Sequence, residues 1–293
     1  MLGRASSAER SIERLAKRRR SRRRRVLFAF FVLCLVLLFA TVYGLRQSAV
    51  RISHVEIFGL SAMPAHAGQA GADASLSRYV TDAMHGWYWG IIPRDSIFFF
   101  PEDGIRSGIL AAHRNIAAVS IFRNGFTGLS LKVDTRTPIA RWCGSATPPQ
   151  AGPPEEQCYV FDASGFIYAA ASSTQTVNAF AVYAPLDPAR GGPPAASETE
   201  PLEATIADAE KLPAVFDFAR ELATLGSPTT RIAIHDGEVN DYLASGTRVT
   251  YVLGHEQDAF TALVSARENL NLSDGSLEYV DLRFDGKVYV KRK

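Results

Sequence analysis

The sequence lacks the residue patterns on which catalysis and metal binding usually depend. Its six histidines include no H-E-x-x-H motif and no pair at metal-ligand spacing. It contains no G-x-S-x-G elbow, no S-x-x-K motif and no G-x-x-x-x-G-K-[ST] phosphate loop. The acidic pairs Glu102 and Asp103, and Glu155 and Glu156, stand at an expected helix start and in an expected loop, where dipole and solvation effects account for them. We therefore predict a protein that is not an enzyme, with no cofactor, no metal and no small-molecule substrate.

Charge is also missing from one long segment near the N-terminus. Residues 26–45 contain no Asp, Glu, Lys or Arg, whereas eight of the nine residues 17–25 are Lys or Arg. Twenty helical residues span ~30 Å, the thickness of a hydrocarbon core, and basic flanks stay on the cytoplasmic side. We expect a basic cytoplasmic tail over residues 1–25, a transmembrane helix over residues 26–45, and all later residues outside the cytoplasm. A cleaved signal peptide is the alternative, but its apolar region is usually only ~7–15 residues long.

The charges of the tail and of the remainder have opposite sign. Residues 1–25 hold eleven Lys or Arg and two Glu, a net of +9, which leaves −7 for the rest of the +2 total. Each Lys or Arg near an anionic leaflet gains ~1 kcal/mol, so the tail is expected to contact lipid headgroups. The outer part has no basic stripe suited to a phosphate backbone, and we predict no nucleic-acid binding.

Cysteine is scarce, with three residues in the chain. Cys34 lies in the expected span, whereas Cys143 and Cys158 flank a segment that contains four prolines and two glycines and therefore predicts a loop. A disulfide across the base of that loop would stabilise the fold by ~3 kcal/mol in the chain-entropy model. We predict this bridge because the compartment is oxidising, with two free thiols as the alternative.

Hydrophobic periodicity predicts an ordered domain after the span. The expected order is strand, helix, helix, strand, strand, at residues 50–60, 73–85, 102–113, 116–122 and 129–133.

An aromatic cluster interrupts this pattern. It comprises Trp87, Tyr88 and Trp89 and the run from Ile97 to Phe100. A ligand site or a membrane-dipping loop would use such residues, but we expect them to pack in the core.

The second half of the outer part predicts a mixed fold. A Pro-, Gly- and Ala-rich exposed loop is expected over residues 184–204, followed by helices and strands. Helices are predicted at residues 212–225 and 256–270, and strands at residues 231–234, 239–243 and 247–253. The chain then ends in a predicted hairpin, residues 279–284 and 287–290, around the two-residue turn Asp285-Gly286.

Four motifs in this order resemble the FtsQ/DivIB family of cell-division proteins. They are V-x-x-R-x-P-I-A-x-W from Val133, Y-V-F-D-A-S-G-F-I-Y from Tyr159, V-x-Y-V-L-G from Val249 and Y-V-D-L-R-F-D-G from Tyr279. The resemblance implies an α+β fold with a POTRA domain over residues 50–135 and an FtsQ-type beta domain over residues 136–293. The chain departs from the family pattern at Thr135, where Glu is usual before Arg136, and at Lys291 to Lys293, where some members carry an aromatic residue.

The resemblance further implies a non-enzymatic scaffold at the division septum of the bacterial cytoplasmic membrane. In that family the last strands accept a segment of FtsB, which binds FtsL, and the complex controls the peptidoglycan synthases FtsW and FtsI. Carried over, the partner-binding residues are Phe284, Asp285, Gly286, Val288, Tyr289 and Val290. A C-terminal strand is often an edge strand, which can pair with an extended segment, although an ordinary buried hairpin is the alternative.

Two other functions remain open from the sequence. A POTRA domain also occurs in secretion and envelope-assembly proteins, which generally continue into a long β-barrel. The last hundred residues of this chain instead predict two helices and no repeated ten-residue amphipathic strands. A membrane-anchored extracytoplasmic hydrolase is the enzymatic alternative.

Overall fold

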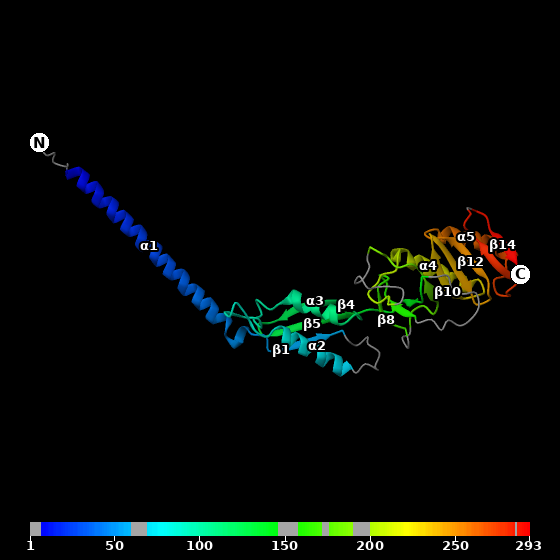
Figure 1. The fold of residues 1–293 in the computed structure, drawn as a ribbon, viewed down its shortest axis with the longest axis horizontal. Coiled ribbons are helices and arrows are strands. Elements are labelled where there is room, and N and C mark those ends of the chain that lie inside the picture. The colour runs from blue at the N-terminus through cyan, green and yellow to red at the C-terminus, as the bar shows by residue number, and fades with distance from the viewer. Residues whose placement is uncertain (1–6, 60–68, 146–157, 172–175, 190–199, 285) are drawn as a thin grey trace. The chain divides into compact units, whose positions relative to one another are not determined.

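The computed structural model describes residues 7–59, 69–145, 158–171, 176–189, 200–284 and 286–293, with side chains from residue 23 of the first helix and residue 74 of the second. The chain forms two compact units (Figure 1). The first unit comprises Met1–Ala112 and Ala118–Asp134, and the second comprises His113–Ala117 and Thr135–Lys293. Helices and strands occur in both units, so the predicted α+β class is confirmed.

The N-terminal helix α1 extends over Ser7–Leu45. Its segment Arg23–Leu45 is long and apolar enough to cross a membrane, and none of its most apolar window is buried. Among the described residues it is the one helix with these properties. A helix that exposes a continuous apolar surface is unfavourable in water, which supports the predicted anchor. The short 3-10 helix η1, Ser48–Val50, follows it.

The first unit contains a three-stranded sheet and two longer helices. The sheet has the order β1-β5-β4, and β1 pairs in parallel with β5, His54 opposite Gly128. Its core includes Leu76 and Val80 from α2, Ile105 and Ile109 from α3, and Leu131 from β5. The bounds are β1, His54–Phe58; α2, Gln69–Ala83; α3, Glu102–Ala112; β4, Ile116–Asn124; and β5, Gly128–Thr135. The expected order of strand, helix, helix, strand, strand is therefore present.

A small hairpin that the sequence did not predict lies between α2 and α3. It consists of β2, Trp87–Tyr88, and β3, Ile92–Pro93.

The expected core packing of the aromatic cluster is correct only in part. Ile97 and Phe100 are buried, but Trp89 is 89% exposed, and Trp87 and Phe98 are each about half exposed. Phe99 is 47% exposed as well, so core packing was wrong for four of these side chains. The most exposed of them, Trp89, occupies the turn of the unpredicted hairpin.

The second unit is built on a nine-stranded sheet of order β14-β13-β12-β11-β10-β9-β6-β7-β8. The helices α4, Leu212–Thr224, and α5, Glu256–Ala266, pack on one face of it (Figure 1), and 3-10 helices η3, Ala209–Lys211, and η4, Arg267–Asn269, adjoin them. The strands are β6, Ala140–Trp142; β7, Tyr159–Phe161; β8, Ile167–Ala170; β9, Ala181–Tyr183; β10, Thr229–His235; β11, Glu238–Leu243; β12, Arg248–Val252; β13, Leu277–Asp281; and β14, Tyr289–Arg292.

Alternate residues of this sheet serve two separate cores. Trp142 and Val182 pack toward α4 and α5, whereas their neighbours Cys143 and Ala181 belong to a second, smaller cluster. This alternation follows from the two-residue period of a strand, which sends neighbouring side chains to opposite faces. The predicted disulfide between Cys143 and Cys158 is confirmed, with a Cα to Cα distance of 4.3 Å, and it belongs to the smaller cluster.

The predicted exposed loop over residues 184–204 is wrong at its ends. Ala184 and Ala204 are buried, and Leu186 forms a β-bridge with Ile206. Residues 190–199 lie outside the described part of the chain. Ala184 is buried because it packs in the main core, and Ala204 lies against β8, where its carbonyl accepts the N–H of Ile167 at 2.9 Å.

The predicted turn around Asp285-Gly286 is confirmed by the N–H of Lys287, which donates to the carbonyl of Phe284 at 3.0 Å, but the strands predicted to flank it are wrong in their bounds. Strand β13 ends at Asp281 and β14 begins at Tyr289, so residues 282–288 form a longer connection. The strands separate early because Leu282 packs into the core and its N–H donates to the carbonyl of Thr250 at 2.8 Å.

Candidate functional site

Strand β14 forms one edge of the nine-stranded sheet. It pairs antiparallel with β13, with Tyr289 opposite Asp281, Val290 opposite Val280 and Lys291 opposite Tyr279. Among the described residues no strand pairs with its other side. An unpaired edge presents a row of backbone donors and acceptors that an extended segment can use.

The backbone of β14 shows which groups point outward. The N–H of Lys293 donates to the carbonyl of Ser276 at 3.0 Å, toward the preceding strand. In an antiparallel pair, successive residues turn their N–H and C=O groups to opposite sides. Lys291 and Tyr289 therefore face β13, and Val290 and Arg292 present their N–H and C=O groups to the open edge. The edge offers two donors and two acceptors to an incoming strand.

Apolar side chains accompany this edge. The rings of Phe284 and Tyr289 meet edge to face with centroids 5.2 Å apart, and both side chains are about half exposed. Val290 is 45% exposed and lies opposite buried Val280, on the face of the sheet that α5 covers. Exposed aromatic and β-branched side chains on an edge strand favour association with another apolar segment.

A groove of about 940 Å³ adjoins these residues, between α5 and the β13–β14 connection. On the helix side, Ala262, Ser265 and Ala266 keep the wall low because their side chains are small. On the other side lie Leu282, Phe284, Gly286 and Val288. His255, Asp258, Thr261 and Arg283 also line the groove, so its lining is part apolar and part polar. The groove is open and continuous with the connection that leads into β14.

An ion-pair network holds the connection at its start. Arg283 donates from Nη2 to Oδ2 of Asp281 and from Nη1 to Oε1 of Glu238, at 2.7 Å each. The hydrogen bond from Arg283 lowers the pKa of Asp281, although partial burial of the carboxyl opposes this effect. Farther along the edge, Nζ of Lys291 lies 2.8 Å from Oε2 of Glu278. These contacts fix the direction in which the chain enters the groove.

The residues predicted from the sequence to bind the partner lie in two parts of the structure. Phe284, Gly286 and Val288 belong to the connection, and Tyr289 and Val290 belong to β14. Asp285 lies outside the described residues. Cys143 and Cys158 lie by β6 and β7, separated from β14 by five strands in the sheet order.

Sequence reasoning missed the helix wall of the groove and the anchoring network. One side of α5 carries the small residues Ala259, Ala262 and Ala266, because positions three and seven apart lie on the same side of a helix. This spacing of small residues is the sequence signal that could have predicted the wall. The Arg283 network was not visible because Glu238 is remote in sequence.

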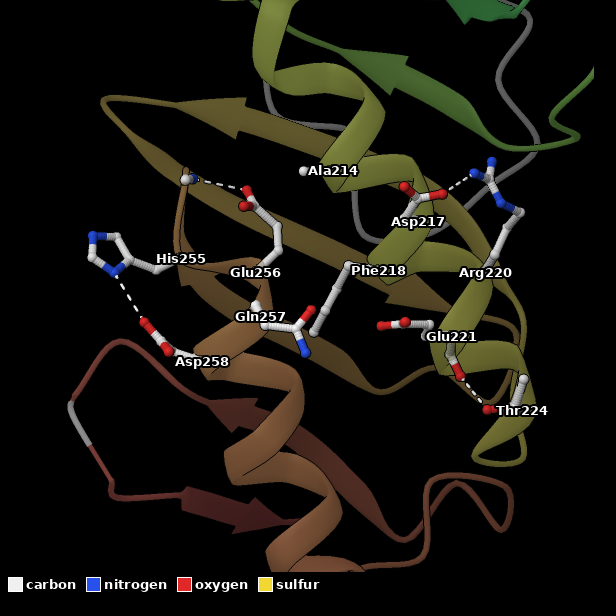
Figure 2. A pocket seen from close by; sticks show the side chains of 11 residues that line it. Ala214, Asp217, Phe218, Arg220, Glu221, Thr224, His255, Glu256, Gln257 and Asp258 are labelled. Atoms are coloured by element: carbon white, nitrogen blue, oxygen red, sulfur yellow. Dashed lines mark hydrogen bonds and ion pairs between the residues drawn. The ribbon is translucent and has the colours of Figure 1, made fainter.

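A second hollow, of about 500 Å³, lies between α4 and α5 (Figure 2). Its carboxylates are Asp217, Glu221, Glu256 and Asp258. Asp217 pairs with Arg220, and Oε1 of Glu256 accepts the N–H of Gly254 at 2.8 Å, as Figure 2 shows. No group of three or more His, Cys, Asp or Glu that could hold a metal ion occurs in the part of the chain that the structure describes. Asp217 thus forms an ion pair within α4, and Glu256 holds the turn that precedes α5, so we assign the hollow no ligand.

No protein-family profile and no curated protein sequence matches this chain.

Proposed function

We propose that the chain is a single-span membrane scaffold of the cell-division machinery, of the FtsQ/DivIB type. The observation that carries this proposal is the open edge of β14, where Val290 and Arg292 present their backbone groups beside the half-exposed rings of Phe284 and Tyr289. The order of elements in the first unit and the position of the motifs support it. In this proposal residues 50–135 are a POTRA domain and residues 136–293 are the beta domain.

One contact links two of the motifs that carry the family resemblance. Arg136, from the first motif, forms an ion pair with Asp162, from the second, and both side chains are largely buried. Thr135 stands where the family usually has Glu, and Arg136 instead has Asp162 as an acidic partner within the same unit. The two motifs are therefore parts of one packed structure, as a shared domain requires.

The proposed partner is an FtsB-like bitopic protein that adds an extended segment to β14. Its backbone would pair with Val290 and Arg292, and an apolar side chain would enter the groove beside α5. An FtsL-like protein would join through this partner and so connect the scaffold to FtsW-like and FtsI-like synthases. The basic tail over residues 1–25 would remain cytoplasmic, and the partner site would act at the division septum.

Affinity capture of the full chain from solubilised membranes tests the proposal. The decisive variant is Val290→Pro, because proline removes an outward N–H while the pairing with β13 uses the neighbouring residues. We expect recovery of FtsB-like and FtsL-like proteins to fall at least about tenfold, the equivalent of ~1.4 kcal/mol.

A matched control exists at the opposite edge of the same sheet. In β8 the N–H of Ala171 donates to Cys158, so the neighbouring Ala170 turns its N–H outward, and Ala170→Pro is expected to leave capture unchanged. Equal loss in both variants would contradict the site. Recovery of β-barrel proteins alone would contradict the division scaffold and favour an envelope-assembly role.

A further inference from the structure

The β2–β3 hairpin exposes its tip to an unusual degree. The N–H of Ile91 donates to the carbonyl of Tyr88 at 3.0 Å and closes a turn with Trp89 and Gly90 at its centre. Trp89 is 89% exposed, the largest exposed fraction among the exposed large hydrophobic side chains of the described residues. Trp87 and Ile91 beside it are each about half exposed.

The backbone conformation at this tip is also unfavourable for a tryptophan. Trp89 has a φ of 49° and Gly90 a φ of 71°, both in the left-handed region. Glycine or asparagine occupies this region readily, whereas a bulky residue with a Cβ is disfavoured. The unit gains little burial from the ring in return, so the position of Trp89 suits a contact outside the unit.

Short contacts hold the hairpin against the residues that follow α1. Arg46 comes directly after the last residue of α1, and its guanidinium lies 5.0 Å from the centroid of the Trp87 ring. The N–H of Ile52 donates to the carbonyl of Asp95 at 2.8 Å, and Nη2 of Arg51 lies 2.5 Å from Oδ2 of Asp95. The hairpin is therefore fixed to a segment that begins one residue beyond the apolar helix.

The chain's reach limits how far the tip can be from a membrane. Trp89 is two residues from Trp87, and two residues of extended chain span at most ~7 Å. The interfacial layer of a bilayer is itself several ångströms deep, since ~40–45 Å of total thickness surrounds ~30 Å of hydrocarbon. If α1 crosses the bilayer, the tip lies within reach of this layer.

We propose that the β2–β3 hairpin inserts Trp89, with Trp87 and Ile91, into the headgroup–acyl boundary of the phospholipid bilayer. Tryptophan concentrates at this boundary because its ring is apolar and its N–H is polar. The first unit exposes two further rings, Phe98 and Phe126, whose centroids lie 6.5 Å apart. The proposal depends on α1 as a membrane span and not on the division function. The hairpin gives the first unit a second contact with the membrane. This contact restricts the rotation of the unit about the segment that follows α1.

Tryptophan quenching in the full chain tests this inference. The sequence has three tryptophans, and Trp142 is buried in the core of the second unit with 1% exposure. The chain is reconstituted in phosphatidylcholine vesicles with and without bromine on the acyl chains near the headgroup. We expect the fraction of emission quenched to be at least about twofold larger in the wild type than in the Trp87→Phe/Trp89→Phe variant, which retains Trp142 alone.

Phenylalanine keeps a ring at both positions, so the variant is expected to retain the far-ultraviolet circular dichroism of the wild type. Trp89→Phe alone is expected to give an intermediate value. Equal quenching in the wild type and the double variant, in chains that float with the vesicles, would overturn the hairpin insertion. A wild-type chain that does not float with vesicles would overturn the span and, with it, this proposal. Neither result bears on the β14 edge, which the measurement does not use.

Discussion

At the scale of single residues, Arg136 shows how one side chain joins distant segments of the second unit. Its Nε donates to the carbonyl of Arg114 at 3.0 Å, and its guanidinium lies 4.1 Å from the centroid of the Phe166 ring. Its ion-pair partner Asp162 also accepts the N–H of Ser164 at 2.9 Å and so closes the turn between β7 and β8. Because the pair is largely buried, loss of either charge leaves the other without its counter-ion.

Arg136→Gln is expected to lower the free energy of unfolding by about 3 kcal/mol, because Asp162 loses its counter-ion in a mostly buried position. Urea unfolding of the full chain in detergent micelles, followed by circular dichroism, measures this change. The control is Lys211→Gln, which removes a surface pair with Asp208 and should cost less than about 1 kcal/mol. Similar effects of both variants would contradict the role given to Arg136.

Asp241 is fully buried on β11, and burial raises its pKa well above the usual range, with a smaller opposing effect from the Tyr251 hydroxyl. The folded chain therefore holds this proton more tightly than the unfolded chain does. The stability contributed by the group is greatest below the unfolded pKa of about 3.9 and is lost as the pH rises through the higher native pKa. Asp241→Asn should be more stable than the wild type at neutral pH, with an advantage that shrinks as the pH falls.

Thermal unfolding at a series of pH values between about 4 and 8 measures this dependence. Asp236→Asn is the control, since Asp236 is exposed in the β10–β11 turn and asparagine tolerates its φ of 51°. A gain for Asp241→Asn that does not change with pH would contradict the assignment.

At the scale of elements, local patterns predicted those structures whose signals lie within the element itself. Strands β10, β11 and β12 lie within two residues of their predicted bounds, because alternating apolar residues are separated by Gly237 and Gly246 in turns with positive φ. The local Asp-Gly signal predicted the turn between β13 and β14, but not where the two strands end, because the packing of Leu282 against the core is tertiary. The groove beside α5 was not predictable, because its two walls come from segments that meet only in the fold.

The Cys143–Cys158 bridge is an element-scale brace between β6 and β7, where Trp142 pairs with Tyr159. Changing both cysteines to serine should lower the free energy of unfolding by ~3 kcal/mol, because the unfolded chain regains loop entropy. Urea midpoints with and without reductant measure this in the wild type. Capture of the partner by β14 should be retained, since five strands separate the bridge from that edge. Identical midpoints under both conditions would contradict the stabilising role.

At the scale of the whole molecule, the proposed activities divide between the two units. The apolar helix α1 and the β2–β3 hairpin belong to the first unit, and the partner-binding edge belongs to the second. Anchoring and recognition therefore depend on different residues, and changes at one are expected to leave the other intact. The uncharged run over residues 26–45 predicted the membrane span. The motif resemblance, together with the position of the last strand at the end of the chain, predicted β14 as the partner-binding strand.

A fluorescent fusion of the full chain should accumulate at midcell in dividing bacteria if the scaffold proposal is correct. Deletion of residues 284–293 should leave the protein in the membrane fraction and abolish recruitment of the FtsB-like partner, because the deletion removes β14 and leaves α1 intact. Live-cell imaging with membrane fractionation measures both. Uniform membrane fluorescence of the wild type throughout division would contradict the proposal.

The central claim is that β14 accepts a partner strand along its open edge, and backbone amide exchange tests it most directly. The full chain in nanodiscs is compared with its complex with FtsB-like and FtsL-like proteins, and exchange is followed at Val290 and Arg292. Exchange of both amides should slow at least about tenfold in the complex, while exchange of the outward amide of Ala170 on the opposite edge should be unchanged. Unchanged exchange at Val290 and Arg292 in a formed complex would contradict the claim.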